Sequence, residues 1–238
     1  MPTFNSSNCI SRSIQSVLKQ TYNDWELLIT DDRSIDNTVE IIESFKDSRI
    51  RLFKLEKNSG AAVARNRSIA NLSGDFIAFL DSDDEWTPTK LYDQISFMKN
   101  NNIRFSFTSY FRIESDASFK INKVGGKTNY KQLLGNTKIY TSSVMIRVFE
   151  GLPLMPNYRR RQDFAYWLDL LKIIDYAYPL NVPLTKYYVT PNSLSSNYIK
   201  SVKSTWFIYR NHEELNLLVS VTYLLSYLFF ALKKRLNS

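Results

Sequence analysis

The first half of the chain alternates short apolar segments with segments in which apolar residues recur every three to four positions. The apolar segments predict strands at 26–30, 50–55, 76–80 and 105–113. Helical spacing occurs before and between them, over 10–18, 39–45, 60–72 and 87–98. Strands and helices that alternate with short connections are typical of a parallel sheet covered by helices. The pattern therefore predicts an α/β fold.

The second half is less regular. The pattern predicts, in order, a loop or hairpin at 118–131, a strand at 143–148, a helix at 163–174, extended chain at 187–194 and one long helical region from Tyr198. The sequence contains no internal repeat and no clear linker. We therefore expect one domain over residues 1–197 and a C-terminal helical extension over residues 198–238.

The composition is that of a folded globular protein, with 44% hydrophobic and 23% charged residues, and it excludes a disordered or fibrous chain. Cys9 is the single cysteine, which excludes an intramolecular disulfide and a cysteine zinc site and indicates a reducing cytoplasm. The formal net charge of +8 indicates an anionic partner. Nucleic acid, an anionic membrane surface and a phosphorylated substrate all remain open on this evidence.

Two acidic clusters stand directly after the first and third predicted strands, Asp31-Asp32 and Asp81-Ser82-Asp83-Asp84. The carboxyl ends of parallel strands form the ligand crevice of such a sheet, so both clusters are expected to face one cavity. Crowded carboxylates repel one another unless a cation neutralises them, and a hard divalent ion shared with phosphate oxygens fits this requirement. A metal-bound diphosphate is the expected ligand. Each cluster taken alone could also be a turn or a helix-capping loop.

Five motifs, in order along the chain, resemble those of family 2 glycosyltransferases: Pro2-Thr3-Phe4-Asn5, Thr30 to Thr38, Gly60 to Asn66, Leu80 to Asp84 and Gln162-Asp163-Phe164. The resemblance covers Pro2 to about Asn197, and five ordered motifs are far more specific than one. It implies a GT-A fold, a Rossmann-like and mostly parallel sheet flanked by helices, here with a C-terminal helical extension. It also implies a hexosyltransferase with a nucleotide-diphosphate sugar donor, a Mn²⁺ or Mg²⁺ ion, and inversion at the anomeric carbon.

The resemblance also implies roles for single residues. Three would contact the base or ribose of the nucleotide: Thr3, Asp31 and Asp32. Asp81 and Asp83 would be the Asp-x-Asp pair for ribose and metal, with Asp84 beside them as a further metal ligand. Carboxylates suit these roles because they accept hydrogen bonds from ribose hydroxyls, and a magnesium or manganese ion needs one or two protein oxygens besides phosphate. The metal would stabilise the departing diphosphate as a Lewis acid.

Arg65 and Asp163 lie near predicted helix starts. Arg65 could meet the nucleotide or its phosphates, or it could be an exposed helix arginine. Asp163 could be a carboxylate favoured by the helix dipole, but the resemblance makes it the general base that deprotonates the acceptor hydroxyl. Most relatives have Glu-Asp here, whereas this chain has Gln162-Asp163, which retains the aspartate. His212, the single histidine, lies beyond the resemblance and is expected to be structural or exposed.

The start of the chain departs from the family pattern. Relatives have an apolar first strand directly before the motif at Pro2, whereas here Met1 stands at its end. Loss of a central strand would leave neighbouring backbone groups unpaired. We therefore expect either a start codon placed too late, which we favour, or a chain that lacks this strand. The polar segment Met1 to Asn8 does not have the pattern of a signal peptide.

The C-terminal segment Leu215 to Leu232 is uncharged and largely apolar, and Lys233-Lys234-Arg235 follows it. A spanning helix and a buried core helix are possible, but we expect a helix in the membrane interface with its basic end on anionic lipid. The protein would then be cytoplasmic and peripheral on the inner face of the cell membrane. By analogy with relatives that build O-antigen, lipopolysaccharide or capsule repeats, the acceptor would be linked to undecaprenyl diphosphate.

The resulting hypothesis is transfer of a hexose, from UDP-glucose or UDP-galactose, to a lipid-linked saccharide in surface polysaccharide biosynthesis. Two alternatives remain. A catalytically degenerate sugar-nucleotide-binding protein is compatible with the missing strand. A basic nucleic-acid-binding protein agrees with the charge and aromatic content, but it leaves both aspartate clusters unexplained.

Overall fold

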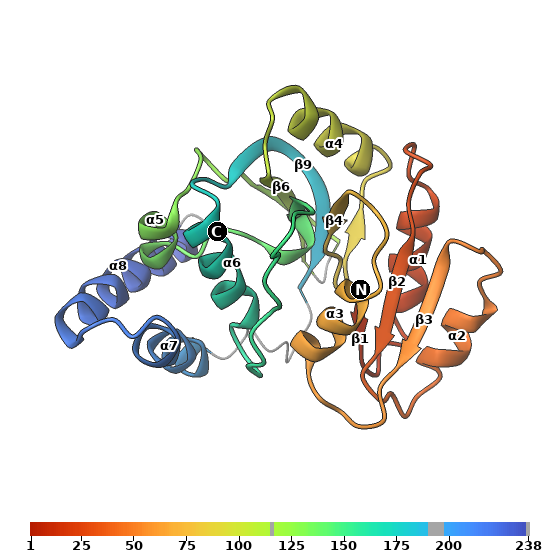
Figure 1. The fold of residues 1–238 in the computed structure, drawn as a ribbon, viewed down its shortest axis with the longest axis horizontal. Helices are drawn as coiled ribbons and strands as arrows, with labels where there is room; N and C mark the ends of the chain where they lie inside the picture. Colours follow the sequence, from red (N-terminus) through yellow and green to blue (C-terminus); the bar gives the residue numbers. More distant parts are fainter. Residues whose placement is uncertain (115–116, 190–197, 237–238) are drawn as a thin grey trace.

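In the computed structural model, which describes residues 1–114, 117–189 and 198–236, the strands form two sheets flanked by helices (Figure 1). The first sheet is parallel in the order β1-β2-β3, with β1 at Pro2–Thr3, β2 at Leu27–Asp31 and β3 at Ile50–Lys54. Every residue of β2 is buried, as expected for a parallel strand covered on both faces. The strands predicted at 26–30 and 50–55 are confirmed within one residue.

The helices of the first half are α1 (Ile10–Leu18), α2 (Thr38–Ser44), α3 (Ala61–Ile69) and α4 (Lys90–Asn100). The apolar face of α1 packs into the core, where Ile10 and Ile14 are fully buried. α2 begins beside Asp36, whose carboxylate accepts hydrogen bonds from the backbone N–H and the hydroxyl of Thr38. The predicted alternation of strands and helices is therefore confirmed in this half.

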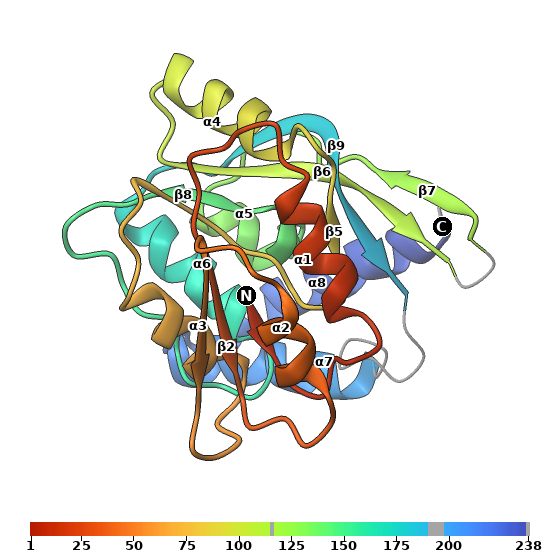
Figure 2. The same cartoon turned by 90° about the vertical axis from the view of Figure 1, so that its right-hand side faces the viewer.

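The second sheet contains β4 (Phe76–Ala78), β5 (Glu85–Trp86), β6 (Phe105–Ile113), β7 (Phe119–Asn122), β8 (Met145–Arg147) and β9 (Tyr178–Tyr188). Its order is β4-β8-β6-β9-β5, and β7 pairs with β6 (Figure 2). The segment predicted as a loop or hairpin at 118–131 therefore contains a strand that pairs with the preceding strand β6. β6 and β9 are parallel, whereas the other pairs are antiparallel. Because β5 pairs with β9, the loop that joins β4 to β5 is fixed at both ends.

The core of the second half forms around α6 (Gln162–Ile173), in which Tyr166, Trp167 and Leu168 are almost completely buried. α5 (Tyr130–Gly135) and the 3₁₀ turn η1 (Thr141–Ser143) precede β8. Both the helix predicted at 163–174 and the strand predicted at 143–148 are present. Figure 1 shows α6 between the second sheet and the C-terminal helices.

The C-terminal part corrects the prediction of one long helical region from Tyr198. α7 (Tyr198–Phe207) continues into a π-helical turn, η2 (Ile208–His212), and α8 (Leu217–Leu236) is a separate helix. The break includes Glu214, whose φ of 51° is incompatible with a right-handed helix. Of the extended chain predicted at 187–194, residues 190–194 lie outside the described residues. In the described part of the chain, no helix has the length and apolarity needed to cross a membrane.

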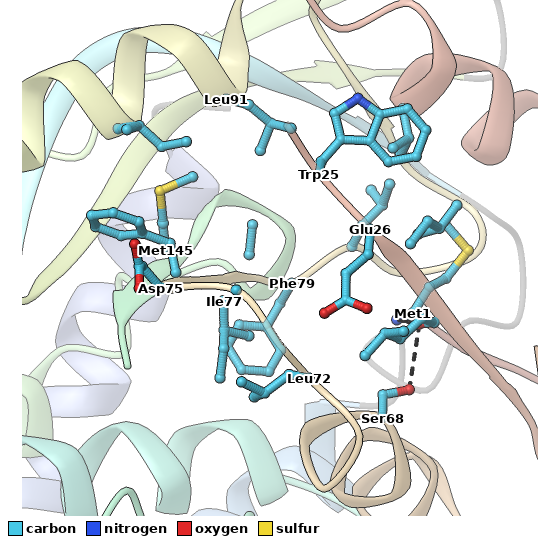
Figure 3. Close-up of a pocket in the computed structure, with 18 of the residues that line it drawn as sticks. Met1, Trp25, Glu26, Ser68, Leu72, Asp75, Ile77, Phe79, Leu91 and Met145 are labelled. Atoms are coloured by element: carbon cyan, nitrogen blue, oxygen red, sulfur yellow. Dashed lines mark hydrogen bonds between the residues drawn. The ribbon is translucent and has the colours of Figure 1, made fainter. Parts of the chain in front are cut away.

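A cavity of about 440 Å³ lies beside Met1, between the residues of β2 and β4 (Figure 3). β1 pairs with β2 through two residues, so its direction upstream of Met1 runs along β2 toward Leu27 and into this cavity. The Met1 ammonium group donates to the Leu28 carbonyl at 2.8 Å, and burial lowers its pKa to about 5. The cavity therefore has the position that a longer β1 would occupy.

An apolar strand added in front of Met1 should stabilise the protein. We expect an extension such as Lys-Ile-Ser-Ile-Val to pair with β2 and fill the cavity. Cavity filling contributes about 0.5–2 kcal/mol, which corresponds to a rise of about 1–8 °C in Tm for a chain of this size. Differential scanning calorimetry should show this rise, and an extension of five glycines and serines should not produce it. Equal Tm values for the two extensions would contradict the interpretation of the cavity.

Candidate active site

The acidic loop between β4 and β5 carries three predicted site residues, Asp81, Asp83 and Asp84. Asp81 is held from α3, because Arg65 Nη2 lies 2.5 Å from Asp81 Oδ1 and the arginine side chain is 6% exposed. The backbone N–H of Asp81 donates to Ser142 Oγ at 3.0 Å. Charge-assisted hydrogen bonds of this kind are stronger than neutral ones. Asp81 is thus positioned by residues from both halves of the chain.

The protein environment disfavours the ionised form of the Asp83 carboxylate. Burial and the negative charge of Asp81 raise its pKa to about 6, against the opposing effect of Arg12 and Arg65. Arg12 donates to the backbone carbonyl of Asp83, at 2.9 Å. Among the described residues, no side chain donates a hydrogen bond to the Asp83 carboxylate. A partly buried carboxylate to which no side chain donates is suited to a hard cation.

Asp84 is fully buried and tied to the second half of the chain. Its Oδ2 accepts hydrogen bonds from the hydroxyls of Tyr140 and Ser142, while its Oδ1 has no partner in the described residues. Burial and the charges of Asp81 and Asp83 raise the pKa of Asp84 well above its usual range. Hard carboxylate oxygens, mutual repulsion and one orphaned oxygen fit a divalent ion such as Mg²⁺ or Mn²⁺. The two proposed metal ligands, Asp83 and Asp84, are consistent with this chemistry.

Thr3 and Asp31, two of the predicted nucleotide-binding residues, lie opposite each other on neighbouring strands of the first sheet. The hydroxyl of Thr3 is buried and has no hydrogen-bond partner in the described residues. The Asp31 carboxylate accepts from the backbone N–H of Ser34 at 2.9 Å and from its hydroxyl at 2.5 Å. The sheet therefore brings Thr3 and Asp31 together at the carboxyl end of their strands.

Asp32 and Arg65, two further residues predicted to bind the nucleotide, already have protein partners. The Asp32 carboxylate accepts from the backbone N–H groups of Ser59 at 2.6 Å and Gly60 at 2.8 Å. Gly60 has a φ of 97°, a conformation that favours glycine. Asp32 thus shapes the loop that enters α3. Arg65 is 5% exposed and bound to Asp81, so the alternative of an exposed helix arginine is wrong.

Asp163, the predicted general base, lies in the first turn of α6. Arg161 precedes the helix with a φ of 59°, so the chain turns sharply there. One oxygen of the Asp163 carboxylate accepts from the backbone N–H of Phe164 at 2.8 Å, and the other accepts from Thr141 Oγ1 at 3.0 Å. Thr141 adjoins Ser142, which binds the acidic loop. Asp163 and the acidic loop therefore bind neighbouring residues of one turn, Thr141 and Ser142.

The turn formed by Tyr140, Thr141 and Ser142 was absent from the sequence prediction, although it contacts Asp81, Asp84 and Asp163. All three residues are uncharged, and hydroxyl side chains are common in loops. The local sequence therefore contains no signal for their role. They reach the site because β8 runs antiparallel to β4, so the amino end of β8 lies beside the carboxyl end of β4, and carboxyl ends of strands border the crevice of such a sheet.

A second polar cluster was also missed by sequence reasoning. The carboxylates of Asp169 and Glu213 and the ring of His212 have ligating atoms within 4.8 Å of one another. Lys172 Nζ lies 3.2 Å from Asp169 Oδ1 and 2.9 Å from Glu213 Oε1. The lysine charge satisfies these carboxylates, so the cluster is best described as an ion-pair network that fixes η2 to α6. His212 therefore has the structural role expected for it.

A family model described as "Glycosyl transferase family 2" matches residues 1–152. The chain is 41% identical over 240 residues to "Putative teichuronic acid biosynthesis glycosyltransferase TuaG" of Bacillus subtilis (strain 168), covering 99% of this chain and 95% of that protein. It is 40% identical over 235 residues to "UDP-Glc:alpha-D-GlcNAc-diphosphoundecaprenol beta-1,3-glucosyltransferase WfgD" of Escherichia coli, covering 98% and 92%.

Among solved structures, the chain is similar to S. aureus TarS 1-349 in complex with UDP-GlcNAc, with a TM-score of 0.73 and 17% sequence identity. The match covers 95% of this chain and 70% of that chain. This likeness shows a shared GT-A fold and confirms the fold class expected from the sequence.

Proposed function

This chain belongs to glycosyl transferase family 2 and is a glycosyltransferase, and from this premise we propose that it moves a hexose from UDP-glucose or UDP-galactose to a saccharide hydroxyl with inversion. The observation that carries the proposal is the position of Asp163. A single turn of chain links this carboxylate to the acidic loop of Asp81 to Asp84. A base on one side and a cation site on the other are what direct displacement at a sugar carbon requires.

The donor half of the site consists of the acidic loop and the ends of β1 and β2. Asp83 and Oδ1 of Asp84 would hold a divalent ion, which when bound supplies Lewis-acid stabilisation of the departing diphosphate. Asp81, which is bound by Arg65, would accept hydrogen bonds from ribose hydroxyls. The unpartnered hydroxyl of Thr3 and the neighbouring Asp31 would contact the nucleoside. Asp32, whose oxygens both bind backbone N–H groups, would act through the loop it shapes.

The acceptor half of the site contains Asp163, which would accept the proton of the attacking hydroxyl. Its two oxygens receive hydrogen bonds from Thr141 and from the backbone of Phe164, so the carboxylate has a fixed orientation. A carboxylate oxygen has a second lone pair beyond the one these donors use. Asp163 is partly exposed, which leaves that lone pair accessible to an acceptor from solvent.

The acceptor is proposed by analogy to a relative. WfgD is described as acting on alpha-D-GlcNAc-diphosphoundecaprenol, and it aligns with 98% of this chain. We therefore assign to this chain an undecaprenyl-diphosphate-linked saccharide acceptor and a place in O-antigen or capsule biosynthesis. Such a lipid would require the enzyme to work at the inner face of the cytoplasmic membrane.

A transfer assay tests the proposed function. Purified protein is incubated with Mn²⁺ or Mg²⁺, a panel of UDP- and GDP-sugars, and a GlcNAc-diphosphate-lipid analogue, and the lipid product is analysed by mass spectrometry. We expect addition of one hexose from UDP-glucose or UDP-galactose. Tight binding of UDP-sugar without transfer to acceptor or water would instead indicate a degenerate binding protein. No binding of any nucleotide sugar would contradict the proposal as a whole.

The helix α8 supports a peripheral membrane location. Its outward stripe consists of Leu218, Val221, Leu225, Phe229 and Leu232, of which Leu218 is 79% and Phe229 is 61% exposed. The opposite face is anchored to the domain, because Arg161 donates to the hydroxyl of Tyr227 at 2.6 Å. An apolar stripe that faces outward, next to the exposed Lys233, is the pattern of an interfacial helix on anionic lipid.

Leu225→Glu should weaken membrane binding, because it places a charge in the middle of the apolar stripe. Burial of a leucine side chain contributes about 1.5–3 kcal/mol, so we expect at least a roughly tenfold lower affinity for vesicles of phosphatidylethanolamine and phosphatidylglycerol. Tyr92→Glu is the matched control, because Tyr92 is similarly exposed but lies on α4. Sedimentation with vesicles measures both variants. Equal sedimentation of Leu225→Glu and the parent would show that α8 does not contact lipid.

A further inference from the structure

Thr141 contacts the proposed base, and its neighbours in the chain contact the acidic loop. On this basis we propose that Thr141 is a positioning residue for Asp163, and that residues 140–142 set the place of the base relative to the acidic loop. The inference rests on the proposed function, because it assigns the arrangement of that site. Neither family resemblance nor sequence pattern assigned these three residues.

The contact to the base is specific to the threonine hydroxyl. Thr141 is 3% exposed, and its Oγ1 donates to Asp163 Oδ2 at 3.0 Å. The backbone N–H of Phe164 holds the other carboxylate oxygen at 2.8 Å. Two donors from different segments, one on each oxygen, define the rotation of the carboxylate. Without the hydroxyl, the backbone N–H alone would orient Asp163.

Ser142 contacts the acidic loop from the opposite side of the turn. Its Oγ accepts from the backbone N–H of Asp81 at 3.0 Å and donates to Oδ2 of Asp84. Its carbonyl accepts from Trp86 Nε1 at 2.8 Å and from Thr185 Oγ1 at 3.1 Å. Ser142 is fully buried, so these four hydrogen bonds are shielded from water. The serine is therefore fixed on both its side chain and its backbone.

Tyr140 completes the attachment of the turn. Its hydroxyl donates to Asp84, and its ring packs against Tyr110 and Tyr187 with centroid distances of 4.8 and 5.1 Å. Its carbonyl accepts from Ser143 Oγ at 2.6 Å. Aromatic contacts of this kind add stabilisation beyond the area they bury. Both neighbours of Thr141 are thus fixed: Tyr140 by its ring contacts and its bond to Asp84, and Ser142 by its bonds to Asp81 and Asp84.

The geometry has a direct consequence for catalysis. Thr141 holds the base and Ser142 holds the acidic loop. Because consecutive Cα atoms are about 3.8 Å apart, these two residues move together. A misplacement of about 1 Å in an active site can lower the rate by about 10²-fold. Loss of the Thr141 hydroxyl should therefore affect the chemical step, while the donor site, which depends on Ser142, keeps its structure.

Thr141→Val and Thr141→Ser separate a positioning role from simple packing. Valine keeps the shape of threonine without the hydroxyl, whereas serine keeps the hydroxyl and loses a methyl group. We expect Thr141→Val to lower kcat by on the order of 10- to 100-fold, with KM for UDP-sugar and the Kd for UDP with Mn²⁺ unchanged. Thr141→Ser should recover most of kcat. Thr205→Val is the matched control, because it deletes the hydroxyl of an equally buried threonine that lies on α7 and donates to the Ser201 carbonyl; it should retain kcat.

A packing role predicts the reverse order, with valine close to the parent and serine impaired, and that result would overturn the inference. A parallel loss of donor affinity in Thr141→Val would also overturn it, because the damage would then extend to the acidic loop. A parent protein that transfers no sugar at all would contradict the proposed function itself. An active parent with an equally active Thr141→Val would contradict the positioning role alone.

Discussion

Asp163→Asn should lower sugar transfer by on the order of 10²- to 10⁴-fold, which is the usual contribution of a general base. The amide preserves the shape of the side chain and its hydrogen bond from Phe164, but it cannot accept the proton of the acceptor hydroxyl. The donor residues lie on other elements, so binding of UDP-sugar should stay close to that of the parent. Steady-state kinetics and calorimetric titration with UDP measure the two effects separately.

Asp175→Asn is the matched control for this prediction. Asp175 lies just beyond the end of α6 and is exposed, so the same chemical change there should leave transfer intact. Transfer by Asp163→Asn at close to the parental rate would show that another group acts as the base. Loss of UDP binding together with transfer would show that the substitution damages the donor site.

Asp83→Ala should abolish metal-dependent transfer while leaving the fold intact. A metal ion contributes several kcal/mol of transition-state stabilisation, so a loss of at least about 10²-fold is expected, since each tenfold change in rate corresponds to about 1.4 kcal/mol. The protein disfavours the charged form of Asp83, whose pKa is raised to about 6. Its removal should therefore not lower Tm. Electron paramagnetic resonance of Mn²⁺ in the presence of UDP should show loss of the bound ion.

Asp24→Ala controls for removal of one negative charge, because Asp24 is exposed. It should retain both Mn²⁺ binding and transfer. If Asp83→Ala binds Mn²⁺ with the affinity of the parent and keeps its metal dependence, Asp83 does not belong to the metal site. If the variant unfolds, calorimetry identifies a structural role instead.

Local signals explain why the first half of the fold could be predicted. The strand at 105–113 was placed at the bounds that the structure has, because its long apolar and β-branched run is bordered by turn-forming residues. The break between α7 and α8 was missed because apolar spacing continues across Glu214, and nothing in the local sequence marks its positive φ. The pairing of β4 with β8 is a contact between distant segments, which local patterns do not record.

The residues of the candidate site also divide into those that have a local sequence signal and those that have none. Asp81, Asp83 and Asp84 could be identified because three carboxylates after a strand form a local and unusual pattern. Asp163 required the resemblance, since a helix-terminal aspartate alone has an ordinary explanation in the helix dipole. Residues 140–142 act through burial and through partners from distant segments. Their role therefore became visible when the fold had brought Asp84 and Asp163 to the same turn.

The configuration of the product tests the central claim most directly, because a single base opposite the metal site permits one displacement at the anomeric carbon. UDP-glucose and UDP-galactose carry α-linked sugars, so one displacement must produce a β-linkage. Proton NMR of the purified product, through the coupling between H1 and H2 of the transferred sugar, distinguishes the two configurations. We predict the large coupling of a β-linked hexose. A small coupling, characteristic of an α-linkage, would contradict the assignment of Asp163 as the base of an inverting transfer.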